Sequence, residues 1–241
     1  MHLRPLISLA LIVSLTGCTD VAAVNDTRDD QQEFALSAQR LVIDNNGGSL
    51  RLIAGSGPAV AVRRSLTGKA TVEGNASWSL TGDTLRLGIN CSGFVPDCGG
   101  LHIVSVPPGV AVELTSDGPV RAVQLAGALT ATVSDAWLKV EDPTGPLHLE
   151  ADLDIDVSGA RSTDVAASSR EHAVHLTFTA PPTRVEARAA GSVKVLLPAG
   201  PETYRVSSAP GRSALKTDPA SKRLVEATAG EGHTASVRKA A

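Results

Sequence analysis

The chain has 241 residues, enough for one sizeable domain with its own hydrophobic core. Aromatic residues make up only 2% of it, which disfavours a fold cored by rings, such as a sugar-binding sandwich with stacking aromatics. The formal net charge is −3, and no basic patch or stripe is visible along the sequence, which argues against a nucleic-acid-binding protein.

The N-terminus has the shape of a secretory signal. Residues 1–17 combine a short positive start at Arg4 with an apolar stretch over residues 6–15, which is too short to span a bilayer comfortably. The sequence Leu-Thr-Gly-Cys then ends at Cys18. It resembles the lipobox of bacterial lipoproteins, which has Leu three residues before the cysteine and small residues between.

The lipobox resemblance implies a modified cysteine. In that family the thiol is alkylated with diacylglycerol, the peptide is cut before the cysteine, and the new amino terminus can be acylated. Two acyl chains give stable anchoring, whereas one chain binds only marginally. We therefore expect an extracytoplasmic protein that is anchored to the cell membrane by lipid on Cys18. The alternative is a plain secretory signal followed by an incidental free cysteine.

Residues 18–33 comprise this cysteine and a polar, acidic stretch with little periodicity. Such a composition predicts a flexible tether that holds the folded part away from the membrane. Regular alternation begins at Phe34, and we expect the folded domain to cover residues 34–238.

Cys91 and Cys98 bracket a short, turn-prone segment. Disulfides persist in the environment of an exported protein, and Cys18 is assigned to the lipid, so these are the two cysteines that remain. We predict a structural Cys91–Cys98 disulfide, with free thiols as the alternative. Their spacing is not that of a thioredoxin-like redox motif, and a zinc site would need more ligands than the nearby His102.

Residues 112–197 carry an internal repeat in which a small or polar corner precedes a short strand of alternating apolar residues. Copies start at Thr115, Val133 and Glu150, and looser ones start at Ala167, Arg188, Val206 and Ala227. The starts lie about 17 to 21 residues apart, a period typical of solenoids. Stacked coils bury a continuous apolar column that one strand cannot bury alone. We predict an all-β fold, a single-stranded β-solenoid (β-helix or β-roll) of short repeated rungs, with an ordinary antiparallel β-sandwich as the alternative.

Three segments resemble a bacterial family of exported proteins usually called putative adhesins. They are IVSVPPGVAVELTSDGPVRAVQLAG at 103–127, SVKVLLPAGPETYRV at 192–206 and LVEATAGEGHTASV at 224–237. In that family a strand that ends in Pro before a Gly, repeated rungs and a V-x-L-P strand build a single-stranded β-solenoid. The resemblance covers roughly residues 41–237 and implies a domain without an assigned reaction.

Asp152, Asp154 and Asp156 occur at every second residue, so we expect them to line one face of a strand. Clustered carboxylates are candidate Ca²⁺ ligands, although no Gly follows at the sixth position of a calcium loop. We prefer a solvated strand face that discourages edge pairing, and hence no bound metal. His172 and His175 are three residues apart and should be surface residues on opposite faces of a strand.

The sequence contains no nucleophile elbow, P-loop or dinucleotide-binding motif. We therefore predict no catalytic residue, no cofactor and no nucleic-acid partner. The predicted function is that of an adhesin-like lipoprotein that binds or spaces envelope components, with an envelope protein or glycan as partner. The alternative is an envelope polysaccharide-active enzyme that uses carboxylates on the solenoid face. Alignment of Asp135, Lys139, Asp154 and Lys194 on one lateral face would suit that alternative.

Overall fold

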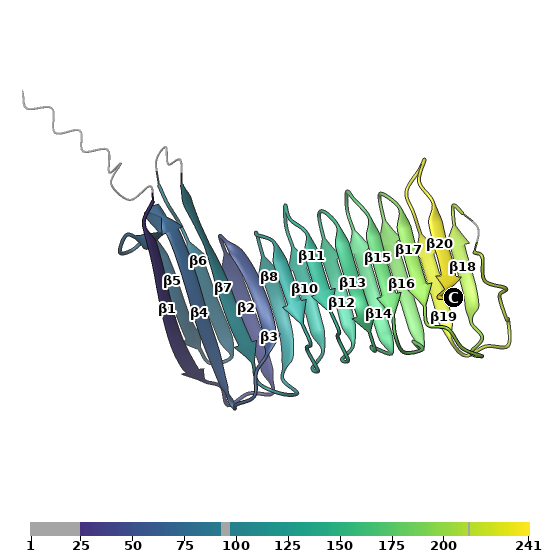
Figure 1. Cartoon of the computed structure of the whole chain (residues 1–241), viewed down its shortest axis with the longest axis horizontal. Helices are drawn as coiled ribbons and strands as arrows, with labels where there is room; N and C mark the ends of the chain where they lie inside the picture. Colours follow the sequence, from purple (N-terminus) through teal and green to yellow (C-terminus); the bar gives the residue numbers. More distant parts are fainter. Residues whose placement is uncertain (1–24, 93–96, 212) are drawn as a thin grey trace, which may run out of the picture.

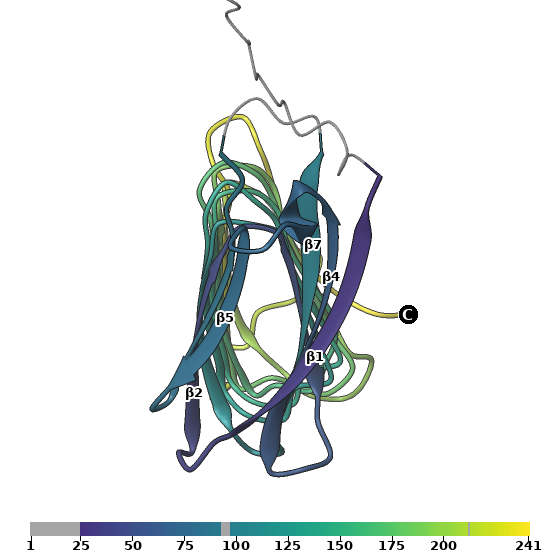
Figure 2. The ribbon, with the colours of Figure 1, turned by 90° about the vertical axis from the view of Figure 1, so that its left-hand side faces the viewer.

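The structure, a computed structural model, describes residues 25–92, 97–211 and 213–241. Apart from one 3₁₀ turn, η2 (Lys69–Thr71), the regular elements of this part are strands. They form two ten-stranded sheets, A and B, which enclose a shared hydrophobic core (Figure 1 and Figure 2). None of the described residues forms a helix long and apolar enough to span a membrane. The predicted signal peptide and Cys18 lie outside these residues.

Within each sheet the strands follow a spatial order that differs from their order in the chain. From one edge to the other, sheet A consists of β1 (Thr27–Ala35), β4 (Ala59–Gly68), β7 (Cys98–Val106), β3 (Ser49–Ala54), β9 (Val120–Val123), β11 (Leu138–Glu141), β13 (Ile155–Ala160), β15 (Val174–Phe178), β17 (Val193–Leu197) and β20 (Ala235–Lys239). Sheet B consists of β18 (Arg205–Ala209), β19 (Leu224–Thr228), β16 (Arg184–Ala189), β14 (Asp164–Ser169), β12 (Leu147–Ala151), β10 (Leu129–Val133), β8 (Ala111–Ser116), β2 (Arg40–Asn46), β6 (Thr84–Ile89) and β5 (Ala76–Thr81).

Successive strands from β8 to β17 enter sheets B and A in turn. Pairing between them is parallel and in register, so that Leu129 of β10 lies between Val112 of β8 and Leu147 of β12. Each coil therefore adds one strand to each sheet, and equivalent residues of successive coils become neighbours. The all-β prediction is confirmed. The two facing sheets agree with the sandwich alternative, but these strands pair in parallel, unlike those of the antiparallel sandwich that we considered.

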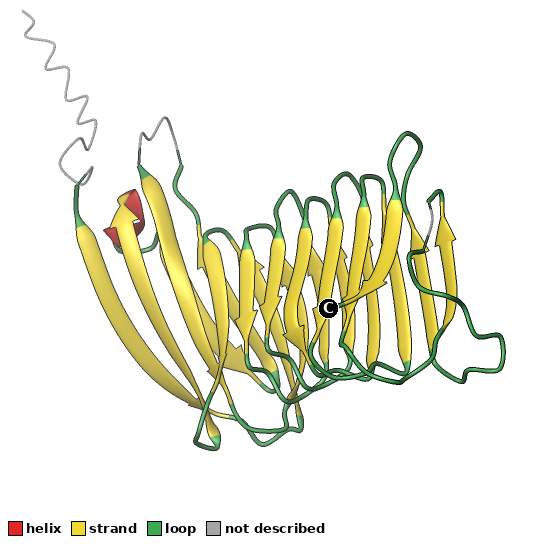
Figure 3. Cartoon of the chain, turned by 45° about the vertical axis from the view of Figure 1, so that its right-hand side comes forward, coloured by secondary structure: helices red, strands yellow, loops and turns green. Residues whose placement is uncertain are grey.

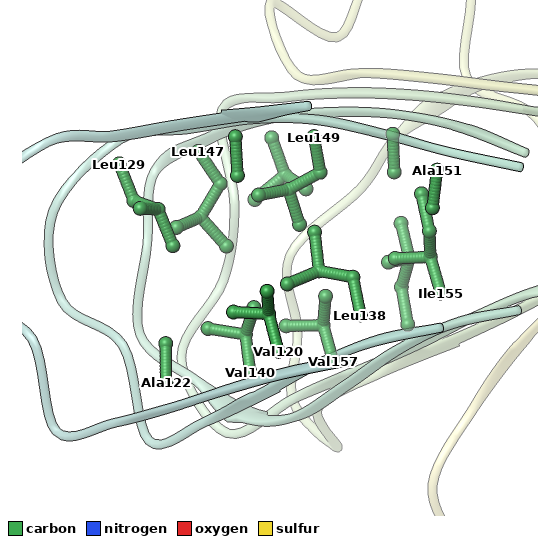
Figure 4. Packing of buried hydrophobic residues seen from close by; sticks show 14 of the residues in the cluster. Val120, Ala122, Leu129, Leu138, Val140, Leu147, Leu149, Ala151, Ile155 and Val157 are labelled. Carbon is green, nitrogen blue, oxygen red and sulfur yellow. The ribbon is translucent and has the colours of Figure 1, made fainter. Parts of the chain in front are cut away.

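The core forms because inward and outward side chains alternate along each strand. In β10, Leu129, Ala131 and Val133 are buried while the threonines between them are not. Figure 4 shows inward side chains of both sheets, among them Leu138 of sheet A and Leu149 of sheet B, filling the space between the two layers. Full burial of one such leucine contributes about 1.5–3 kcal/mol. Neither sheet can bury its inner face alone, so each depends on the other.

Tight corners connect the sheets, and several require glycine. At Gly145 a Cβ atom would meet the carbonyl oxygen of Gly127, and at Gly127 it would meet the carbonyl oxygen of Val110. These oxygens belong to the neighbouring coil. The corner therefore lets successive coils approach closely enough for their strands to pair.

Residues 27–33, which we expected in a flexible tether, belong instead to strand β1. This strand pairs antiparallel with β4 over its whole length. Its polar sequence is accommodated because the Asp30 carboxylate accepts hydrogen bonds from Nε of Arg64 at 2.9 Å and from Nε of Arg28 at 3.1 Å. The prediction was wrong here because it treated low apolar content as absence of structure, whereas an edge strand tolerates paired charges.

The predicted disulfide between Cys91 and Cys98 is present. Cys91 follows β6 of sheet B, and Cys98 is the first residue of β7 in sheet A. With 6.3 Å between the two Cα atoms, the bond connects the two layers near the N-terminal end of the stack.

Both ends of the stack are covered. The first coil, β2 and β3, is enclosed: β2 lies between β6 and β8, and β3 lies between β7 and β9. Antiparallel strands β1, β4 and β5 lie outside it. At the other end β18 forms the edge of sheet B, and the following loop covers β20 (Figure 3). There the Ala235 N–H donates to Pro210 O at 2.8 Å, and the Ala214 N–H donates to Val237 O at 3.1 Å.

We predict that Gly145→Ala destabilises the protein by about 1–3 kcal/mol, because its Cβ would force neighbouring coils apart. Gly57→Ala is the matched control, since a Cβ at Gly57 has open space and the backbone is not left-handed. It should change stability by less than about 0.5 kcal/mol. Urea unfolding followed by circular dichroism measures both. Equal effects of the two substitutions would contradict the role assigned to the corner.

Candidate functional site

The outer face of sheet A carries a continuous line of side chains that comes from residues far apart in the sequence. In-register pairing places Arg121 beside Lys139, and Lys139 beside Asp156. We call this line, one residue from each strand between β4 and β20, the sheet A row. Its members in spatial order are Arg63, Ile103, Arg51, Arg121, Lys139, Asp156, His175, Lys194 and Ser236. Neighbouring strands are about 4.8 Å apart, which sets the spacing of the row.

Positive charge on this face exceeds the carboxylates available to neutralise it. Arg121 Nη2 lies 2.7 Å from Glu141 Oε2, and Lys139 Nζ lies 3.5 Å from Oε1 of the same residue. The hydrogen bond from Arg121 is the main cause that lowers the pKa of Glu141. One carboxylate therefore serves two cations, while Arg51 and Lys194 form no ion pair within the described part of the chain.

The outer face of sheet B differs. Arg40 pairs there with Asp83 at 2.9 Å and with Glu113 at 3.2 Å, and Glu186 accepts bonds from the two arginines beside it. Its outward strand cations are Arg40, Arg86, Arg184, Arg188 and Arg205, and its carboxylates are Asp44, Glu113, Glu150, Asp164, Glu186 and Glu226. On sheet A beyond β1 the cations are Arg51, Arg63, Arg121, Lys139, Lys194 and Arg238, and the carboxylates are Glu141 and Asp156. Positive charge is thus concentrated on one side of a protein whose net charge is −3.

An exposed tryptophan flanks the sheet A row. Trp137 is 44% exposed and immediately precedes β11. Its carbonyl oxygen accepts the N–H of Val120, which continues the in-register pairing. Because Ala136 and Leu138 on either side are buried, the indole faces outward with Lys139. An apolar ring beside cationic side chains is a common composition for binding surfaces.

The same face is hollowed over its C-terminal strands. An open depression of about 510 Å³ lies across β13, β15, β17 and β20, and the charged or polar side chains around it include Asp156, His175, Lys194 and Arg238. It continues the sheet A row, so the row and the depression form one surface along the stack.

The three predicted metal-ligand candidates do not share a strand face. Asp152 and Asp154 lie in the corner between β12 and β13, and only Asp156 lies in a strand. The prediction was wrong because the two-residue period of the sequence continues through a corner, where the chain passes from one sheet to the other. No group of three or more His, Cys, Asp or Glu among the described residues is arranged to hold a metal ion.

The corner carboxylates brace neighbouring coils. Asp152 accepts hydrogen bonds from the Asp135 N–H at 2.8 Å and from Arg170 Nη1 at 2.7 Å, and both bonds lower its pKa, the Asp135 bond most. The Asp154 carboxylate accepts the Ala173 N–H at 3.1 Å. Desolvation raises the pKa of Asp154, but this bond and the others to the carboxylate outweigh it, and the net shift is downward. Both carboxylates are therefore held in the ionised form, and their hydrogen bonds link neighbouring coils.

The other sequence candidates are divided between corner and face. His172 lies in a corner with Nδ1 3.3 Å from Asp154 Oδ2, whereas His175 lies on β15 in the sheet A row. The enzyme alternative required Asp135, Lys139, Asp154 and Lys194 to share one lateral face. Lys139 and Lys194 lie in the sheet A row, whereas Asp135 and Asp154 lie in corners. Trp137 was not predicted as a site residue, although its place next to the inward Leu138 in an alternating pattern indicates that it faces outward.

A second group of polar side chains lies inside the N-terminal end of the stack. His102 is fully buried on β7, and Arg64, opposite it on β4, is only 9% exposed. Nε of Arg64 bonds to Asp30, and its guanidinium carbon lies 4.0 Å from the centroid of the Trp78 ring. Neither ring nitrogen of His102 has a hydrogen-bond partner among the described residues. Burial, aided by the charge of Arg64, lowers the pKa of His102 to about 4.

Comparison with solved structures finds matches at low identity and low TM-score. One named "putative cell adhesion protein", from Clostridium sporogenes ATCC 15579, has 10% identity and a TM-score of 0.44 over 89% of this chain and 99% of that one. A "putative adhesin" from Bacteroides fragilis NCTC 9343 has 9% identity and a TM-score of 0.34, over 88% and 97%. A "putative lipid binding protein" from Parabacteroides distasonis ATCC 8503 has 11% identity and a TM-score of 0.31, over 89% and 98%.

The sequence matches no protein-family model and no curated protein.

We predict that stability falls as the pH decreases from about 6.5 to about 4 in a manner that depends on His102. The unfolded chain takes up this proton near the ordinary pKa of 6.5, whereas the folded protein takes it up only near 4. The unfolded state therefore binds more protons in this window, and the full loss is about 3 kcal/mol. His102→Gln, which cannot titrate, should flatten the profile. Urea unfolding at several pH values measures both proteins, and parallel profiles would contradict the assignment.

Proposed function

We propose that this protein is a non-enzymatic, adhesin-like protein of the cell envelope that binds an envelope component through the outer face of sheet A. The observation that carries the proposal is the sheet A row, in which cations that outnumber the neighbouring carboxylates lie in line beside an exposed tryptophan. Arg51, Arg121 and Lys139 stand on three consecutive strands of the sheet. A rigid array of this kind presents several contacts at fixed spacing without ordering a loop, which lowers the entropic cost of binding.

We infer further that the stack is a β-solenoid. Parallel pairing, in-register neighbours and one strand per coil in each sheet support this reading over that of an antiparallel sandwich. In a solenoid the inward residues hold the coils together, and the outward residues are available to form a binding surface along the axis.

The polysaccharide-active enzyme is less well supported, because its best carboxylates are engaged elsewhere. A general acid needs a raised pKa to hold its proton near neutral pH. The pKa values of Asp152 and Asp154 are shifted the other way by hydrogen bonds between coils. These carboxylates are suited to holding the corners and not to proton donation.

We propose lipid attachment at Cys18 as the means of anchoring. Since β1 begins at Thr27, only residues 19–26 separate the cysteine from the first strand. Such a segment reaches at most about 28 Å when fully extended. An anchor at Cys18 would keep the N-terminal end of the stack close to the membrane. The C-terminal coils come later in the chain, away from the anchored end.

We predict that combined Arg51→Gln, Arg121→Gln and Lys139→Gln substitutions weaken retention of the purified full-length protein on envelope material stripped of the native protein by at least about tenfold, which corresponds to about 1.4 kcal/mol. Sedimentation of the protein with envelope fragments measures the affinity. The matched control carries Arg86→Gln, Arg188→Gln and Arg205→Gln, which remove the same charge from sheet B. Equal retention of both variants would show that the sheet A face is not the binding surface.

Anchoring is tested separately. The native protein should have a mass consistent with a chain that starts at a diacylglycerol-modified Cys18, and it should sediment with membranes because two acyl chains anchor it stably. Cys18→Ala should abolish the mass gain and release the protein. An unlipidated native protein cut at another residue would exclude the anchor and leave the binding face unaffected.

A further inference from the structure

We propose that the ligand of this face is a linear acidic polysaccharide, with its carboxylates along the sheet A row and one of its sugar rings stacked on Trp137. The inference rests on the proposed function, because it names the chemistry that the same face recognises.

The geometry of the row suits a linear polymer that lies along the stack axis. Its residues are spaced by the distance between strands, about 4.8 Å, which is comparable to the advance per sugar in an extended polysaccharide. Arg51, Arg121 and Lys139 offer cations at three consecutive steps, and Lys194 offers another among the residues that line the depression. A uronate chain presents carboxylates at a similarly regular interval, so several ion pairs can form in one orientation.

The charges of the row favour an anionic chain. Arg51, Arg121 and Lys139 carry three positive charges, whereas Glu141 and Asp156 beside them carry two negative charges, which leaves net positive charge on this part of the row. Arginine can bind a carboxylate through two parallel hydrogen bonds, which adds geometric specificity. The remainder of the protein is negative overall, so an anionic polymer is repelled from other faces and attracted to this one.

Trp137 supplies the contact that an array of cations lacks. The face of an indole is electron-rich, and it packs against the C–H groups on the flat side of a sugar ring. The ring is 44% exposed and belongs to the residue just before β11, two positions from Lys139, so a sugar over it keeps its carboxylate within reach of the row.

Other anionic partners fit less well. Single-stranded nucleic acid is held by successive bases stacked on several aromatic side chains. The chain has only 2% aromatic residues, and among the described residues Trp137 is the one large aromatic side chain that is exposed. An anionic lipid surface would be matched by a broad basic patch, whereas these cations follow a single line.

The test uses the full-length protein in detergent and three polymers. Polygalacturonate is the acidic probe, its fully methyl-esterified form is the neutral control with the same backbone, and oligothymidylate is the competing polyanion. Calorimetric titration should show binding of polygalacturonate that weakens with added salt, little binding of the ester, and weaker binding of oligothymidylate.

Variants locate the site. Arg51→Gln/Arg121→Gln/Lys139→Gln should weaken polygalacturonate binding by at least about tenfold, and the sheet B triple variant should stay within about twofold of the native protein. Trp137→Ala should weaken binding by about fivefold or more, and Trp137→Phe by less, because a ring is kept. Arg51→Gln/Lys194→Gln breaks no ion pair of the described structure and keeps the test valid if the triple variant unfolds.

The outcomes distinguish the acidic-polysaccharide proposal from the proposed function. Absence of polygalacturonate binding, equal binding of the ester, tighter binding of oligothymidylate, or insensitivity to the row variants would overturn the acidic-polysaccharide proposal. If envelope retention still depended on the row in those cases, the proposed function would stand with a different ligand. Binding of polygalacturonate through the row without envelope retention would support the ligand chemistry and reject the envelope role.

Discussion

Parallel, in-register pairing between successive coils is the constraint on which the rest of this structure depends. Because Leu129 stacks between Val112 and Leu147, every inward position forms an apolar column and every outward position forms a line of exposed side chains. The column supplies most of the stability, since burial between neighbouring coils favours stacking. The exposed side chains do not contribute to this column, so their residue types can vary without loss of the fold. The glycine corners, the hydrogen bonds of the corner carboxylates and the outward line of charged side chains all follow from this one register.

The register also explains how a mildly acidic chain forms a basic surface. Arg51, Arg121 and Lys139 are separated by long stretches of sequence, yet they become nearest neighbours in sheet A. The sheet B face shows the opposite balance, with Arg40, Arg184 and Arg188 paired to carboxylates. Average charge therefore says little about recognition by this protein, because the two sides of the sheet pair have different electrostatic characters.

Short-range patterns were sufficient to predict the strands, the alternation of Leu138 with Val140 and the disulfide. They failed where the chain changes sheet: Asp152 and Asp154 keep a two-residue period, but corner geometry turns them toward the neighbouring coils. They also failed at β1, where cross-strand charge pairs, which no local window contains, hold a polar segment. The basic row could have been predicted from the sequence. Alignment of the repeat copies that start at Thr115, Val133 and Glu150 places Arg121, Lys139 and Asp156 at one position, so the copies needed only to be compared side by side.

The enclosed first coil has a consequence for how this architecture can change in length. Strands β2 and β3 already have partners on both sides, β1, β4 and β5 close one end, and β18 with the loop after it closes the other. A coil appended at either chain terminus would meet the edge strands β1 and β5, or β18 and the loop that bonds to β20, and not an edge of the repeating coils. A duplicated coil between β8 and β17, by contrast, would meet matching edges above and below. Elongation or shortening of this protein in evolution is therefore confined to its middle, and each added coil would lengthen the core and the exposed line together.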